Sequence, residues 1–253
     1  MSIHQTPAAW PKLGQIDGQL NEIIKANPAL AAHSLGDVLD VPAARKQLLA
    51  MASRNPPVNL EGIEKSEIHI PVRDRSNIRT LIYKPKASLS SDSPLVILYH
   101  GGGWCLGTAE FEEPRAAKLI VENSPKLGAK PSAGLVIGGS SAGANITAVL
   151  SHLARDNSLV PQLTGVYLHV PFTCAPEILA ERYGQEYTSY EQNVNAPILD
   201  VKAVEFFRRY YAPEGKSELF SPLLWPLGHG GLLKTYFQIS GLDPLRDDGL
   251  IYA

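Results

Sequence analysis

The sequence predicts an α/β protein built on a mostly parallel sheet, with helices on both faces and a helical cap. Four short apolar runs have the composition of strands that are buried on both sides. These runs are LVILY (95–99), GLVIG (134–138), GVYLHV (165–170) and TYFQIS (235–240). Helical patterns follow the first two runs, over 112–121 and 142–154. This alternation of buried strand and helix is typical of a parallel sheet.

Two other regions stand outside this alternation. Residues 1–60 have helical and loop-rich patterns, with predicted helices over 16–25 and from Pro42 to Ser53. The stretches EIHIPV and IRTLIYKP flank the polar RDRSN and predict a β-hairpin that starts at Glu67. We expect three parts, which are an N-terminal cap segment (1–60), an α/β core (61–174 and 221–253) and a helical cap insertion (175–220).

The composition limits the classes of protein that the chain can form. Its 253 residues are 44% hydrophobic and 19% charged, which suits one large domain and excludes whole-chain disorder. The formal charge of −2 gives no basic excess, so we expect no nucleic-acid partner. No secretory apolar region opens the chain, and no apolar run reaches the roughly 18 residues of a membrane span. Only two cysteines, Cys105 and Cys174, suit a reducing compartment, so we expect a soluble cytoplasmic protein.

A G-x-S-x-G pentapeptide occupies residues 139–143, between a predicted strand and a predicted helix. This is the context of a nucleophile elbow, where a sharp turn holds the serine in a strained conformation and glycines let the backbone approach closely. The helix N-terminus then favours the negative charge that develops during attack. A simple glycine–serine turn is the alternative, and the flanking elements favour the functional interpretation. Ser141 is the candidate nucleophile, and Ser140 occupies the position before it.

A glycine-rich loop, HGGGW (100–104), directly follows the first buried strand. Successive backbone N–H groups after a strand can converge on one point, as an oxyanion hole requires. A phosphate-binding loop is the rival hypothesis, but G-K-[ST] and G-x-G-x-x-G are both absent. A flexible loop explains the glycines but not their combination with an elbow serine.

The motifs HGGGW, GGSSAGAN and GLDPLRDDG resemble the hormone-sensitive-lipase-like branch of the α/β-hydrolase superfamily, particularly its fungal carboxylesterase-like members. The resemblance extends from about residue 60 to the last residue. It implies hydrolysis of small carboxylic esters through an acyl-serine intermediate, with no cofactor and no metal. The site residues that it implies are Ser141 as nucleophile, Asp243 as triad acid, Gly102, Gly103 and Ala142 as oxyanion donors, and His100 with Gly101 as support for the loop.

Three acidic residues near the C-terminus can also be explained by the stabilisation of a helix N-terminus. Asp243 could be the N-cap of a helix over LRDDGLIYA, with Pro244 at its first position. This role is compatible with that of a triad acid. Asp247 and Asp248 fall in the first turn of that helix, where the helix dipole is sufficient to explain them.

The chain departs from the family pattern in two places. It stops ten residues after Asp243, inside the helix that in the family leads to a further strand and the catalytic histidine. Between HGGGW and the elbow there is room for one helix, where the family has helix, strand and helix. We therefore interpret the chain as internally deleted, near 121–124, and C-terminally truncated. In the family the absent strand lies between the second and third strands, so we expect unpaired strand edges there and an aggregation-prone chain.

The remaining histidines offer no obvious replacement for the triad histidine. His152 lies about 16 Å along the helix from Ser141, and His229 should sit at the opposite sheet edge. His169 ends a strand at the catalytic edge, where we expect an ordinary strand histidine. We expect little or no esterase activity, and two alternatives stay open: a catalytically silent ligand-binding homologue and an incomplete gene product.

Overall fold

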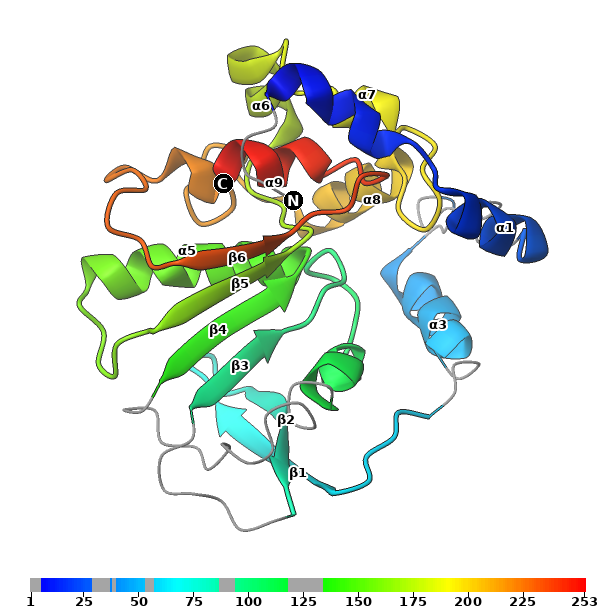
Figure 1. Cartoon of the computed structure of the whole chain (residues 1–253). Coiled ribbons are helices and arrows are strands. Elements are labelled where there is room, and N and C mark those ends of the chain that lie inside the picture. The colour runs from blue at the N-terminus through cyan, green and yellow to red at the C-terminus, as the bar shows by residue number, and fades with distance from the viewer. Residues whose placement is uncertain (1–5, 29–36, 38–39, 53–56, 87–93, 118–133) are drawn as a thin grey trace.

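The structure is a computed structural model that describes residues 6–28, 37, 40–52, 57–86, 94–117 and 134–253. Its centre is a four-stranded parallel sheet in the order β3-β4-β5-β6 (Figure 1). The strands are β3 (Leu95–Tyr99), β4 (Leu135–Ser140), β5 (Gly165–His169) and β6 (Thr235–Gln238). All four predicted strands are confirmed, with ends that differ by at most two residues, and so is the α/β fold class.

The predicted hairpin forms a separate sheet. Strands β1 (Ile63–Pro71) and β2 (Asn77–Pro85) pair antiparallel, and β1 starts four residues before the predicted position. Among the described residues no strand joins β2 to β3, which is the place where we expect the family's missing strand. Ion pairs from Lys65 to Glu113 (2.9 Å) and from Arg79 to Glu110 (2.7 Å) hold the hairpin against the segment that follows the glycine loop.

Helix α5 (Ala142–Asp156) covers one face of the parallel sheet and confirms the helix predicted over 142–154. Its Ala144 and Ala148 are spaced four residues apart, so they share a face and pack on the strands. The helix predicted over 112–121 is helical at 113–117, after the 3-10 turn η3 (Ala109–Glu112), and residues 118–121 lie outside the described part. The turn η3 contacts β3.

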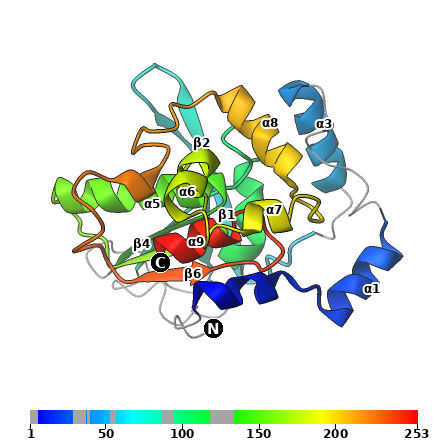
Figure 2. The same ribbon diagram turned by 90° about the horizontal axis from the view of Figure 1, so that it is seen from above.

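Several helices gather above the carboxyl ends of the parallel strands (Figures 1 and 2). From the middle of the chain they are α6 (Pro176–Tyr183), α7 (Ser189–Gln192) and α8 (Val201–Tyr211). From the N-terminal region they are η1 (Pro7–Gly14), α1 (Gly18–Ala26) and α3 (Val41–Ala52), and the last two confirm both predicted N-terminal helices within two residues. The last element, α9 (Arg246–Tyr252), lies beneath them.

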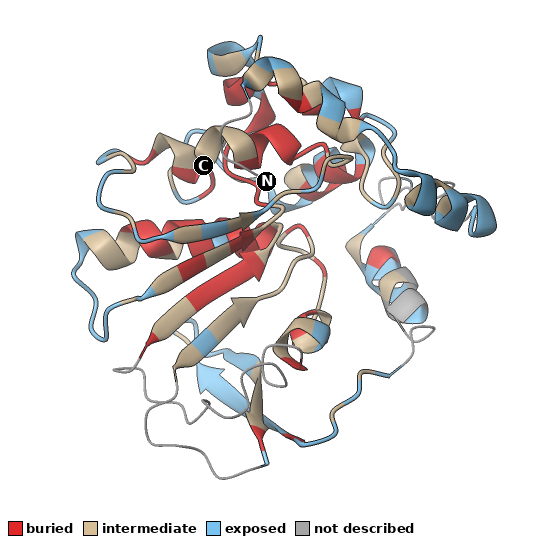
Figure 3. Ribbon diagram, in the orientation of Figure 1, coloured by how far each residue is buried: buried red, intermediate tan, exposed pale blue. Residues whose placement is uncertain are grey.

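Buried residues concentrate on β4, β5, α5 and α9 and on the helices that face them (Figure 3). The largest apolar cluster joins the sheet edge to the overlying helices. Its buried members are Phe172, Cys174, Ala175, Ile178, Leu179, Tyr187, Val204, Phe220 and Leu245. No helix in the described part of the chain has the length and apolar character to cross a membrane.

Candidate active site

Ser141 stands at the turn between β4, which ends at Ser140, and α5, which begins at Ala142. Its backbone torsion angles are φ 54° and ψ −116°, a region that residues other than glycine rarely occupy. The N–H of Ser141 donates to the carbonyl oxygen of His169 at 2.9 Å, and its own carbonyl accepts from the N–H of Asn145 at 2.9 Å. The predicted strand-to-helix turn is therefore confirmed.

Both glycines of the pentapeptide are required by close backbone contacts. A Cβ atom at Gly139 would lie 2.3 Å from the carbonyl of Gly143. A Cβ atom at Gly143 would lie 2.0 Å from the carbonyl oxygen of Tyr99, the last residue of β3. Since real Cβ contacts are never this short, only glycine lets the start of α5 approach the end of β3.

The glycine loop turns back on itself beside the elbow. Gly102 and Gly103 have φ values of 129° and 56°, and a Cβ atom at Gly102 would lie 2.2 Å from the carbonyl oxygen of Leu106. The carbonyl of Gly102 accepts the N–H of Leu106 at 2.8 Å. Nδ1 of His100 donates to the carbonyl of Gly101 at 2.8 Å, so the ring of His100 is bound to the loop.

The N-terminal helix α3 also holds this loop, a contact that sequence reasoning missed. Nε and Nη2 of Arg45 donate to the carbonyl oxygen of Cys105 at 3.1 and 2.8 Å. The adjacent Ala44 is fully buried in a cluster with Leu106 and Phe207. Figure 2 shows α3 beside α8. No signal in the sequence links residue 45 to residue 105, because the two are far apart in the chain and neither belongs to a motif.

A small cavity of about 20 Å³ brings the two motifs together. Ser141 and Gly103 both line it, and its remaining lining is apolar and comes from four different segments. These other residues are Trp104, Phe172, Leu199, Val204, Phe207 and Leu245. The indole ring of Trp104 stacks on Tyr211 of α8 with a centroid distance of 5.1 Å. The nucleophile candidate therefore faces an apolar space that α8 closes.

Asp243 follows β6 and lies two residues before Leu245, a cavity-lining residue. Its Oδ1 accepts the N–H of Leu245 at 2.8 Å, and burial raises its pKa to about 6. Helix α9 begins only at Arg246, and its N-cap residue is Leu245. The prediction that Asp243 is the N-cap and Pro244 the first helical residue is therefore wrong, because the chain forms a separate turn there before the helix starts.

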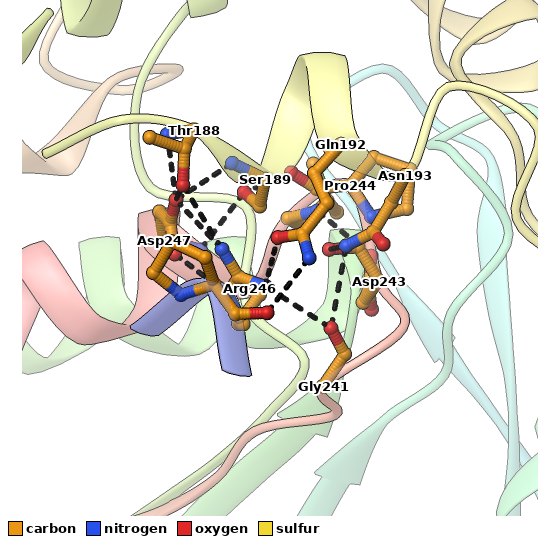
Figure 4. Close-up of polar contacts among 11 residues, drawn as sticks. Thr188, Ser189, Gln192, Asn193, Gly241, Asp243, Pro244, Arg246 and Asp247 are labelled. Atoms are coloured by element: carbon orange, nitrogen blue, oxygen red, sulfur yellow. Dashed lines mark hydrogen bonds and ion pairs between the residues drawn. The ribbon is translucent and has the colours of Figure 1, made fainter. Parts of the chain in front are cut away.

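Asp247 and Asp248 are fully buried, and their contacts are more specific than the helix dipole requires. One oxygen of Asp247 accepts the N–H groups of Thr188 and Ser189 at 2.7 Å each, and the other pairs with the buried Arg246 at 2.7 Å (Figure 4). Asp248 accepts the N–H of Thr173 at 3.2 Å. The prediction that the dipole is sufficient to explain these carboxylates is wrong, since Asp247 joins α9 to the start of α7 and Asp248 joins α9 to the segment between β5 and α6.

None of the hydrogen bonds among the described residues joins a histidine side chain to Ser141. Nδ1 of His169 lies 2.8 Å from Oγ of Ser140 and 2.8 Å from Nη2 of Arg115. Nε2 of His152 lies 2.8 Å from the hydroxyl of Tyr252, and its ring lies 5.1 Å from that of His229. His4 and His33 lie outside the described residues. In the part of the chain that the structure describes, no group of His, Cys, Asp and Glu has an arrangement that could hold a metal ion.

The sequence of this chain is similar to those of known hydrolases. The model of the alpha/beta hydrolase fold family matches residues 113–253. An AB hydrolase superfamily protein of Schizosaccharomyces pombe is 30% identical over 95% of this chain and 81% of its own length. The carboxylesterase NlhH of Mycobacterium tuberculosis is 29% identical over 94% of this chain and 82% of its own length.

Solved structures show the same fold. One of two fungal esterases from Rhizomucor miehei superposes with a TM-score of 0.77 at 22% identity, covering 94% of this chain and 82% of that one. Vibralactone cyclase superposes with a TM-score of 0.71 at 27% identity, covering 90% and 80%. The chain therefore belongs to the alpha/beta hydrolase fold family, in its hormone-sensitive-lipase-like carboxylesterase branch.

Proposed function

We propose that this chain reacts with small carboxylic esters through Ser141, with the backbone N–H groups of Gly102, Gly103 and Ala142 as oxyanion donors. The observation that carries the proposal is that Ser141, in its strained turn, and Gly103 line the same apolar cavity. The esterase names of its relatives support ester hydrolysis as the reaction class. They do not favour the alternatives of a catalytically silent binding protein or an incomplete gene product.

The proposed reaction has two steps. Oγ of Ser141 attacks the ester carbonyl carbon and loses its proton, and the resulting oxyanion is stabilised by the three N–H groups. Expulsion of the alcohol leaves an acyl group on Ser141. Water then attacks this acyl ester and releases the carboxylic acid and the free serine. Asp243 is the proposed acid of the triad, and His100 and Gly101 support the loop.

Among the described residues no histidine side chain is hydrogen-bonded to Ser141. We propose that solvent accepts the proton of Ser141 and that this proton transfer limits the rate. Loss of one triad member typically slows such enzymes by a factor of about 10⁴. We therefore propose slow acylation and little turnover.

We also propose that 1–60 and 175–220 form the cap over a core of 61–174 and 221–253, and that the chain acts in the cytoplasm.

The test is a single-turnover acylation experiment with p-nitrophenyl acetate. The expected result is slow release of p-nitrophenolate together with an acetyl group on the peptide that contains Ser141, detected by mass spectrometry. Because imidazole itself attacks p-nitrophenyl acetate, its effect is measured on the acetyl group at Ser141, which should form faster in the wild type when added imidazole acts as a base. Ser141→Ala should show only the background rate, whereas Ser66→Ala, an exposed serine on β1, should behave like the wild type. Equal rates in the wild type and Ser141→Ala would refute the proposal.

A further inference from the structure

His169 is bound to the elbow at two successive residues. Its carbonyl oxygen accepts the N–H of Ser141 at 2.9 Å, and its Nδ1 lies 2.8 Å from Oγ of Ser140. Both contacts follow from the parallel register, in which Ser140 on β4 stands opposite His169 on β5. One residue of β5 therefore holds both the last strand residue and the first residue of the turn.

The imidazole is itself oriented by Arg115. Nη2 of Arg115 lies 2.8 Å from Nδ1 of His169, and Nη1 lies 2.8 Å from Oε2 of Glu112. Glu112 is buried, with 6% of its surface exposed, so this ion pair has a defined position. The ring of Tyr167 stacks beside the imidazole, with 14° between the two planes. The imidazole thus contacts Arg115 from the helical residues after η3, Ser140 of β4 and Tyr167 of β5, and Glu112 of η3 holds Arg115 in place.

These contacts decide the protonation state of His169. A guanidinium group can only donate hydrogen bonds, so Nδ1 must be the acceptor and the ring proton must be on Nε2. The hydroxyl of Ser140 then also donates to Nδ1. Burial, followed by the nearby charge of Arg115, lowers the pKa of His169 to about 4, in agreement with a neutral ring.

We propose that His169 is a positioning residue: its neutral imidazole, oriented by Arg115, binds the Ser140 hydroxyl and so keeps Ser141 in its strained turn. A strained turn relaxes unless the surrounding contacts over-determine it. His169 binds both the Ser140 side chain and the N–H of the Ser140–Ser141 peptide. The same contacts exclude His169 as the base for Ser141, because its acceptor nitrogen is already engaged. This inference rests on the proposed role of Ser141 as the nucleophile.

The first test separates positioning from binding. It measures the limiting rate of Ser141 acetylation and the half-saturating concentration of p-nitrophenyl acetate. His169→Ala should lower the limiting rate by about tenfold or more, since small displacements of reacting groups have large effects, and should leave the half-saturating concentration nearly unchanged. His169→Asn should restore most of the rate, because its Oδ1 can replace Nδ1 as acceptor. His69→Ala, which changes an exposed histidine on β1, is the control.

The second test does not depend on reactivity. Nitrogen-15 NMR of the histidine rings should show His169 neutral, with its proton on Nε2, between about pH 5 and 8. Arg115→Met should change that signal. If the wild type is not acetylated at all, the proposed function fails, but the NMR result still decides the state of His169. A proton on Nδ1, or His169→Asn as slow as His169→Ala in a folded protein, would overturn the inference.

Discussion

Phe207 of α8 lies directly against Gly103 of the glycine loop. A Cβ atom at Gly103 would lie only 2.1 Å from Cγ of the Phe207 ring. Because the ring also lines the cavity beside Ser141, a single side chain from the overlying helices limits the space next to Ser141. This contact leads to the first prediction.

Shortening Phe207 should enlarge the cavity and change the preference for acyl length. Phe207→Leu should raise the rate of Ser141 acylation by p-nitrophenyl butyrate relative to acetate. Both rates are measured by p-nitrophenolate release in a single turnover. Phe206→Leu is the matched control, since Phe206 is buried in the same cluster but does not line the cavity. An equal shift of the ratio in both variants would contradict the prediction.

Gly143→Ala should prevent acylation of Ser141 and destabilise the fold. The added Cβ would lie 2.0 Å from the carbonyl oxygen of Tyr99, so the start of α5 must move away from β3. Overpacking of this kind costs about 1–3 kcal/mol of unfolding free energy. Urea denaturation followed by tryptophan fluorescence measures it. Gly18→Ala, where a Cβ atom meets nothing within 4 Å, should leave both properties unchanged.

Arg45→Ala should slow acylation with a small effect on stability. The variant loses two hydrogen bonds to the carbonyl of Cys105 at an exposed site, so the unfolding free energy should change by about 1 kcal/mol or less. The glycine loop also loses its connection to α3, and the proposed oxyanion donors are then held less firmly. The acylation rate is compared with that of Lys46→Ala, an exposed neighbour on the same helix. Identical rates in the two variants would show that α3 does not support the loop.

Acid should destabilise the protein through His152. Burial, with the nearby His229 and Arg155, lowers the pKa of His152 to about 4. An unfolded histidine titrates near 6.5, so the unfolded chain binds more protons and the unfolding free energy falls between about pH 6.5 and 4. His169 acts in the same direction, and Asp243, with its raised pKa, acts in the opposite one.

A comparison of the wild type with His152→Phe isolates the contribution of His152 to the pH dependence of the unfolding free energy, because His169 and Asp243 are present in both proteins. The unfolding free energy of the variant should depend less steeply on pH in that window. Urea unfolding curves at several pH values give both slopes. Parallel slopes would mean that His152 is not held neutral in the folded protein.

Separation of the hairpin from the parallel sheet should favour self-association. Ile68, Ile70 and Ile78 are exposed by 44%, 44% and 55%, and the register places Ile78 opposite Ile70 on one face of the hairpin. Exposed apolar side chains that lie together on one face favour association between chains. We expect concentration-dependent association in size-exclusion chromatography with light scattering, reduced in Ile78→Lys. A wild-type monomer with one cooperative urea transition would contradict this expectation.

The sequence by itself determined the strands, the elbow and the loop beside it. Buried strands are visible as short apolar runs, and the glycines of the two motifs are visible because close backbone contacts tolerate no other residue. The position of Ser141 between β4 and α5 was therefore predictable. The helix start at Arg246 was not, because Asp243 bonds to the turn before the helix.

Only the tertiary structure decided which side chains meet at the site. The contacts of His169 with Arg115, of Phe207 with Gly103 and of Asp247 with Thr188 all join segments that are far apart in the chain. Local periodicity carries no information about such pairs, because it reflects only which face of one element is buried. Partners are chosen when strand register and helix packing bring separate faces together, and the burial of a charged or polar group then requires that each finds a hydrogen-bonding partner.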